Sequence, residues 1–267
     1  MIKSSYQGVE MPQRESHIQG TPSWVDLTTD NLAESKAFYS HVLGWDFTEV
    51  PFGGVSYTMA TLDGRRVAGL MQQNQEQIDH GPPPRWNTYL AVDDATKTIE
   101  LVSGAGGQAL MPPVELMDSG SMAAMADRSG TQVGLWQAGT HTGTQVVDEL
   151  GALVWNELVT DDVPAVVAFF GSLFGWTTSE IETPVGPYTI FSVDGNPAGG
   201  IRQRAHDQIE THWETYFSVA SIDDMLGVVG KTDGLIDEPS DIGFAKVAAV
   251  RDPQGAVFYA MEAINFP

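Results

Sequence analysis

Three acidic residues stand near aromatic residues at the spacing of a β-strand. Asp26 and Glu157 each follow a tryptophan by two positions, and Glu214 precedes Tyr216 by two. Side chains two positions apart on a strand share a face, so each carboxyl group is expected beside an aromatic ring. A buried carboxyl group needs a partner, such as a backbone N–H group, a tyrosine or an arginine, unless it serves a function. Two of them in one cavity could share a proton as acid and base, or hold a cation.

Asp26 and Glu157 stand at corresponding positions because the chain is an internal duplication. Residues 24–45 read WVDLTTDNLAESKAFYSHVLGW, and residues 155–176, which lie 131 positions later, read WNELVTDDVPAVVAFFGSLFGW. A repeat of this length indicates two related halves. Other matched pairs, some at a slightly smaller offset, are Tyr57 and Tyr188, Gly69 and Gly200, Trp86 and Trp213, Tyr89 and Tyr216, and Asp127 and Asp252.

Each half divides again into two units with one order of elements. An alternating strand opens each unit, an amphipathic helix follows, and further strands separated by turns complete it. In the first unit Asn31 can cap the helix, and Gly44 suits the position after its end. The pattern predicts an α+β protein of four βαβββ modules, which span residues 20–75, 85–138, 152–205 and 212–264. An N-terminal arm (residues 1–19) and a linker (residues 139–151) lie outside the modules.

The repeated motif resembles that of the vicinal oxygen chelate superfamily. It is a strand with an aromatic start, then D/N-x-x-x-(A/S)-x-x-F-Y-x-x-x-(L/F)-G-W, and later D-P-x-G at a hairpin, as at residues 252–255. That superfamily includes glyoxalase I, extradiol dioxygenases, fosfomycin-inactivating enzymes and bleomycin-binding resistance proteins. The tandem layout and the phrase WQAGTHTGTQVVDELGALVWNEL look closest to an actinobacterial glyoxalase-like subgroup that includes a mycobacterial culture-filtrate antigen. The resemblance implies two domains, residues 20–138 and 152–267, each a curved mixed sheet around a cavity.

In metal-using members of that superfamily, the ligands are His, Glu or Gln on the opening and last strands of the modules. The matching positions are Trp24, Asn87 and Gly134 in the first cavity, and Trp155, Glu214 and Tyr259 in the second. Trp and Gly supply no ligand, and Asn is a weak donor for transition metals. No metal or other cofactor is therefore expected, although a divalent metal is possible with Glu214 as its ligand.

The resemblance also groups the residues that could act together. The second cavity could assemble Glu157, Glu214 and Tyr259 as catalytic groups, with His212 near its mouth. The tryptophans could instead be core residues, and the acids could be satisfied by structural partners. The residues expected to bind a ligand are Trp24, Asp26, Asn87, Tyr89, Trp155, Glu157, Glu214, Tyr216 and Tyr259.

Composition excludes several classes of function. The 13 basic and 35 acidic residues give a net charge of −22, which disfavours nucleic acids and anionic membranes as partners. The absence of cysteine removes disulfides, thiolate nucleophiles and Cys-ligated metal sites. No apolar run reaches transmembrane length and no signal peptide is recognisable, so a cytoplasmic protein is expected.

Three functions remain open from the sequence. The first is the binding of a small, planar or aromatic organic molecule in a metal-free cavity lined by Trp, Tyr and carboxylates. The second is a metal-dependent lyase or dioxygenase that acts on a dicarbonyl, a thiol adduct or a catechol-like substrate through the second cavity. The third is a structural or signalling scaffold whose cavities are filled. A small molecule is the expected partner, and the oligomeric state is left open.

Overall fold

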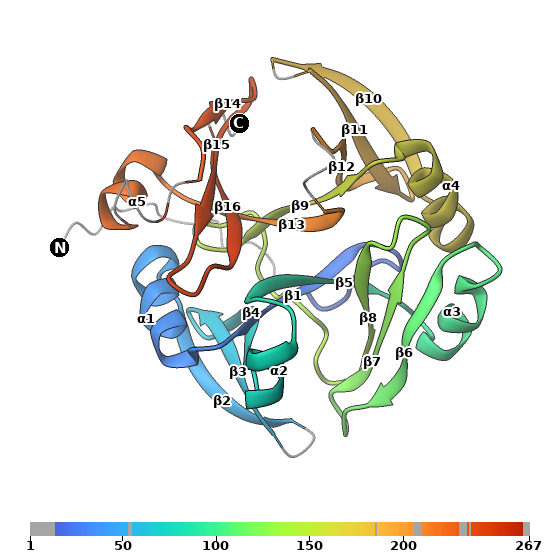
Figure 1. Ribbon diagram of the computed structural model, residues 1–267, viewed down its shortest axis with the longest axis horizontal. Helices are drawn as coiled ribbons and strands as arrows, with labels where there is room; N and C mark the ends of the chain where they lie inside the picture. The colour runs from blue at the N-terminus through green and yellow to red at the C-terminus, as the bar shows by residue number, and fades with distance from the viewer. Residues whose placement is uncertain are drawn as a thin grey trace.

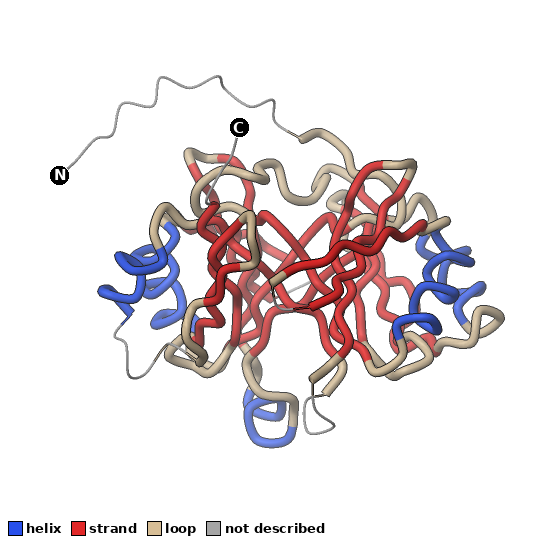
Figure 2. Tube along the Cα trace, turned by 90° about the horizontal axis from the view of Figure 1, so that it is seen from above, coloured by secondary structure: helices blue, strands red, loops and turns tan. Residues whose placement is uncertain are grey.

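The computed structural model describes residues 14–52, 55–184, 186–205, 210–229, 234 and 236–263. Over these residues the chain forms two eight-stranded mixed sheets with helices at their sides, as Figures 1 and 2 show. The predicted α+β fold of repeated βαβββ modules is confirmed. No helix within the described ranges is both long and apolar enough to cross a membrane.

The first sheet combines two modules. Its two central strands, β1 and β5, run antiparallel, and each has a parallel neighbour from its own module, β4 or β8. The two modules therefore meet at their opening strands. In spatial order the sheet contains β2 (Asp46–Phe52), β3 (Val55–Leu62), β4 (Arg65–Gln72), β1 (Pro22–Thr29), β5 (Arg85–Ala91), β8 (Gln132–Ala138), β7 (Gly120–Ala126) and β6 (Gln108–Glu115).

The second sheet repeats this topology with the other two modules. Its central antiparallel pair is β9 and β13, flanked in parallel by β12 and β16. Figure 1 shows this sheet curling so that its outer strands rise on either side of the central pair. In spatial order it contains β10 (Thr177–Thr183), β11 (Gly186–Val193), β12 (Asn196–Gln203), β9 (Leu153–Thr160), β13 (His212–Ser218), β16 (Val257–Ala263), β15 (Ala245–Arg251) and β14 (Ser240–Asp241).

Helix α1 begins and ends where the sequence predicts, and α4 repeats its caps. Asn31 caps α1 (Leu32–Leu43) and Asp162 caps α4 (Val163–Phe174), each by accepting a hydrogen bond from a backbone N–H of the first turn. Both helices end at a glycine with a left-handed backbone, Gly44 at φ 74° and Gly175 at φ 71°. The other two module helices are α3 (Ala95–Val102) and α5 (Ile222–Val229). A short helix between modules, α2 (Gln75–His80), was not predicted.

The hydrophobic core lies between the two sheets and is shared by both halves. Helix α1 packs against α5, and α3 packs against α4. In one core cluster Trp45 of the first half contacts Phe217 of the second, with ring centroids 5.2 Å apart. Tyr39 donates a hydrogen bond across the same boundary to Asp252 at 3.0 Å. One face of each central strand is therefore core, and the alternate side chains point to the opposite face, toward the inside of the curl.

The chain segments that precede the two halves are also related. The indole N–H of Trp45 donates to the carbonyl oxygen of Gly151 at 2.7 Å, and that of Trp176 donates to Gly20 at 2.9 Å. Gly20 and Gly151 differ by the same 131 positions as the repeat. The linker that leads into the second half thus packs against the first half.

Candidate functional site

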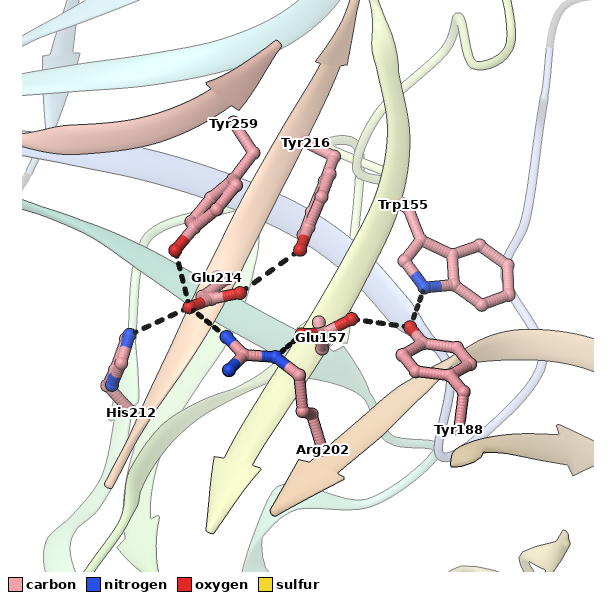
Figure 3. A network of polar contacts seen from close by, with 8 residues as sticks. All are labelled: Trp155, Glu157, Tyr188, Arg202, His212, Glu214, Tyr216 and Tyr259. Carbon is pink, nitrogen blue, oxygen red and sulfur yellow. Dashed lines mark hydrogen bonds and ion pairs between the residues drawn. The ribbon is translucent and has the colours of Figure 1, made fainter. Parts of the chain in front are cut away.

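Two buried carboxyl groups face each other on the central strands of the second sheet. Glu157 on β9 and Glu214 on β13 are direct partners in the antiparallel register, and each residue is only 4% exposed. Arg202 of β12 joins them: its Nε donates to Glu157 at 2.6 Å, and its Nη2 donates to Glu214 at 2.8 Å. The second half therefore contains an acid–guanidinium–acid arrangement, which Figure 3 shows. It lies on the side of the sheet away from the shared core, because the next residue along β9, Leu158, points into that core.

Three tyrosine hydroxyls complete the hydrogen bonding of the acids. Tyr188 of β11 donates to Glu157 at 2.5 Å and accepts a hydrogen bond from the indole of Trp155 at 2.9 Å. On the other side, Tyr216 and Tyr259 donate to the two oxygens of Glu214 at 3.1 and 2.7 Å. The tyrosines fix both carboxylates in place, because every bond restricts a rotamer that would otherwise be free.

The outer edge of this network reaches the surface. The side chains of Arg202 and His212 are 36% and 42% exposed, whereas those of the acids beneath them are nearly inaccessible. His212 lies 3.2 Å from Glu214 through Nε2, and its Nδ1 lies 2.7 Å from the carbonyl oxygen of Glu210. Both ring nitrogens thus face acceptors, an arrangement that suits the protonated imidazolium.

Electrostatics separate the two acids. Burial raises the pKa of Glu157, and the neighbouring charge of Glu214 raises it further. Burial also opposes ionisation of Glu214, but a hydrogen bond from His212 and the charge of Arg202 outweigh it and lower the pKa of this carboxyl. Burial likewise opposes a charge on His212, yet its bond to Glu214 dominates and raises its pKa. One acid therefore holds a proton more readily than the other, as in sites that pair a proton donor with a base.

A glycine in β12 makes room for this network. A Cβ atom on Gly200 would collide with the hydroxyl of Tyr188, and one on the matched Gly69 would collide with the hydroxyl of Tyr57. Only a residue without a side chain lets the tyrosine reach the carboxylate on the neighbouring strand. The repeat of both tyrosine and glycine at the same offset was visible in the sequence.

As far as the structure describes it, the corresponding face of the first half has one acid and no bridging cation. Asp26 accepts hydrogen bonds from Tyr57 at 3.2 Å, Tyr89 at 3.1 Å and Asn87 at 2.9 Å. Asn87 stands where the second half has Glu214, and Met71 stands where it has Arg202. Burial raises the pKa of Asp26, since only neutral donors contact it directly.

The structure brings most of the predicted residues together, but in two separate groups. The first is Trp24, Asp26, Asn87 and Tyr89, and the second is Trp155, Glu157, Glu214, Tyr216 and Tyr259. Trp24 is 3% exposed and behaves as a core residue, whereas Trp155 is partly exposed. Their roles in binding or catalysis remain predictions. The sequence reasoning missed Arg202, Tyr188 and Tyr57.

The donor set of the second group does not fit a metal ion. One oxygen of Glu214 already receives Arg202, Tyr259 and His212, and the other receives Tyr216. The positively charged guanidinium lies between the carboxylates, where a cation would otherwise be held. Among the described residues, no group of three or more His, Asp or Glu side chains is arranged to hold a metal ion.

Gly134, the third position that matches a metal ligand in the first cavity, is a glycine because Tyr89 packs against it. A Cβ atom there would meet the ring of Tyr89, so the tyrosine fills the space that a ligand side chain would need. In the second half, Tyr259 stands at this position and stacks on Tyr216, with ring centroids 4.7 Å apart. At this position neither half therefore has a His, Glu or Gln side chain.

Comparisons with known proteins agree with the fold and the duplication. Residues 21–135 match the family described as the Glyoxalase/Bleomycin resistance protein/Dioxygenase superfamily. "Putative glyoxylase CFP32" of Mycobacterium tuberculosis is 38% identical over 257 residues, covering 94% of this chain and 98% of the relative. "Anthracycline biosynthesis protein DauV" of Streptomyces sp. strain C5 is 30% identical over 259 residues, covering 91% and 93% of the two chains.

A solved structure shares the same architecture at low sequence identity. The Mn(II)-bound glyoxalase from Novosphingobium aromaticivorans superposes with a TM-score of 0.64 and 15% identity, covering 93% of this chain and 83% of that one. This likeness concerns the fold alone. The identity to the mycobacterial relative over almost the full length of both chains decides the family: the chain belongs to the glyoxalase/bleomycin resistance protein/dioxygenase superfamily.

Proposed function

We propose that the protein binds a small, planar organic molecule on the inner face of its second sheet, without a metal ion. The observation that carries this proposal is the position of Arg202. Its guanidinium is fixed by two buried acids, while about a third of its side chain (36%) stays exposed. A fixed, partly exposed guanidinium offers its planar face to an aromatic ring. The partly exposed rings of Trp155 and Tyr259 flank the same network.

The charge balance of the network supports a neutral or weakly charged ligand. The guanidinium is already paired with the ionised Glu214 and donates to Glu157 as well, so it has less attraction left for an anion. The relative DauV carries a name from anthracycline biosynthesis, and anthracyclines are polycyclic aromatic molecules. This name supports a flat aromatic ligand for the present chain as well.

The test is a titration of the purified, chelator-treated protein with 1,4-dihydroxyanthraquinone, a neutral planar probe. Saturable binding at one site per chain is expected, with at least tenfold weaker affinity in the R202M variant. The matched control is R85M, which removes the exposed arginine of the first half that contacts Asn87. Equal affinity in R202M and the unaltered protein would refute the proposed site. No saturable binding at all would favour a scaffold.

A second candidate function is proton transfer on a dicarbonyl or its thiol adduct. It is favoured by the opposite pKa shifts of Glu157 and Glu214, which leave a protonated acid near an ionised one. In this case Glu214 would act as the base and Glu157 as the acid, with Tyr259 as a hydrogen-bond donor to the substrate oxygen. The test is turnover of methylglyoxal–thiol adducts by metal-free protein. Activity that is absent, or that is unchanged in E214Q, would exclude this candidate.

A further inference from the structure

A separate cavity of about 540 Å³ lies beside the start of β9. Its walls come from Val154 and Trp155 of β9, from Asn196 and Pro197 at the start of β12, and from the segment before β1. Its size falls within the range of pockets that hold drug-sized molecules. It shares only Trp155 with the polar network, because the lining contains neither acid of that network nor Arg202.

In the first half, the linker occupies the matching place. Ser23 corresponds to Val154 at the repeat offset, and its carbonyl oxygen accepts a hydrogen bond from the backbone N–H of Thr144 at 2.8 Å. Arg66 corresponds to Pro197, and its carbonyl oxygen accepts from the N–H of Gln145 at 2.8 Å.

Two side-chain contacts extend the same correspondence. Arg65, the counterpart of Asn196, forms two hydrogen bonds of 2.8 Å with Glu149 of the linker. Trp24, the counterpart of Trp155, receives the imidazole of His141 against its ring, with centroids 4.4 Å apart and planes at 88°. Four positions that line the cavity in the second half are therefore covered by linker residues in the first.

In the first half, the linker thereby indicates which kind of group fits beside Trp24 and, by correspondence, beside Trp155. A flat nitrogen heterocycle packs edge-to-face on Trp24, which is the favourable geometry for an aromatic pair. Burial lowers the pKa of His141 to about 3, so the ring that occupies this place is neutral. The charged groups that line the cavity in the second half are Arg14 and Asp148, which have opposite signs.

We propose that the cavity beside Trp155 is a second binding site, which takes a neutral planar nitrogen heterocycle in the place that His141 fills in the first half. The apolar walls supplied by Val154, Val193 and Pro197 exclude water from the ring. The site is independent of the proposed function, because its ligand contacts Trp155 from the side of the linker rather than through Arg202.

The experiment uses full-length protein labelled with 5-fluorotryptophan and benzimidazole as the probe, with detection by fluorine NMR at pH 7.5. The chain has seven tryptophans, and the resonance of Trp155 is assigned with the W155F variant. Benzimidazole is expected to shift the Trp155 resonance in a saturable manner and to leave that of Trp24 unchanged. Shifts at other tryptophans only, or no saturable shift, would overturn the proposal.

Two variants that fill the cavity test the position directly. Ala198 and Asn196 line the cavity, so A198F and N196F should each weaken benzimidazole binding at least tenfold. A109F, on the exposed strand β6, is the matched control and should bind as the unaltered protein does. Because Asn196 is an exposed residue at the start of β12, N196F keeps the test valid if A198F fails to fold. Unchanged affinity in a folded cavity variant would refute the site.

Two further variants separate the remaining explanations. R202M should leave benzimidazole affinity within threefold of normal even where it abolishes anthraquinone binding, so the two proposals can fail independently. Residues 1–12 precede the segment that lines the cavity. If benzimidazole binds only after their deletion, the cavity belongs to the chain's own N-terminal segment and the proposal is wrong. Binding with and without these residues supports it.

Discussion

Replacing Arg202 by methionine should expose the electrostatic cost that this residue offsets. The change copies the first half, where Met71 stands at the corresponding position. Without the guanidinium, Glu157 and Glu214 would lie opposite each other with only tyrosine and histidine donors. Breaking a buried ion pair by removing one partner costs roughly 3–5 kcal/mol. Because the Arg202 side chain is 36% exposed, solvent screens part of this, and we expect about 3 kcal/mol.

The loss should depend on pH in a defined direction. Removal of Arg202 raises the pKa of both carboxyl groups in the folded state above their values in the unfolded chain. A raised folded-state pKa contributes stability at low pH that disappears as the pH rises through it. R202M should therefore be much less stable than the unaltered protein at pH 8, and the difference should shrink at pH 5.

A second substitution should restore most of the loss. R202M/E214N leaves one buried acid opposite an asparagine, which is the arrangement of Asp26 and Asn87 in the first half. Urea denaturation of the three proteins, followed by circular dichroism at pH 5 and pH 8, measures the free energies of unfolding. If R202M loses equally at both pH values, or if E214N adds a further loss, the acid–guanidinium–acid interpretation is wrong.

Three other outcomes follow from the structure. E157Q should flatten the decline in stability between pH 5 and pH 8, because burial raises the pKa of Glu157 in the folded state; an unchanged profile would contradict this. H141N should remove a loss of folding stability of about 2 kcal/mol at pH 5. Burial lowers the pKa of His141 to about 3, so below pH 6.5 an imidazole that is protonated in the unfolded chain must lose its proton on folding. Denaturation at pH 7.5 serves as the reference. G200A should cost about 3 kcal/mol by displacing Tyr188, whereas G227A, on a helix with open space around it, should be neutral or stabilising in thermal unfolding.

The sequence predicts the fold well because the fold is repeated. One opening unit read alone is a weak signal, but the same strand and helix pattern at a fixed offset leaves few alternatives. The register of the opening strands also follows from simple alternation, which placed Glu157 on one face with Trp155 and Glu214 on one face with Tyr216. The pairing of β9 with β13 then brings the two acids together.

The cation between the acids could not be located in the same way. Arg202 lies 45 residues from Glu157 in the sequence, and its position depends on the parallel register of β12 against β9. Nothing local in NPAGGIRQ fixes that register. The need of a buried acid for a partner was predictable, but an arginine was only one candidate beside a tyrosine or a backbone N–H group. The available signal for Tyr188 was its recurrence as Tyr57, together with Gly69 and Gly200.

The two halves also show how one scaffold can carry two different polar centres. A divalent ion and a guanidinium both neutralise facing carboxylates, but the guanidinium brings directed N–H donors and needs no open coordination position. Because Arg202 bonds to both acids, a metal ion that approaches Glu214 must displace a charge-assisted hydrogen bond. The positive charge of Arg202 also repels it. The first half differs at both places: Asn87 stands in place of the second acid, and the linker covers the adjacent Trp24. Because the halves diverge at both the polar centre and the linker contact, ligand binding on this chain should reside in the second half alone, with its stoichiometry as the direct measure.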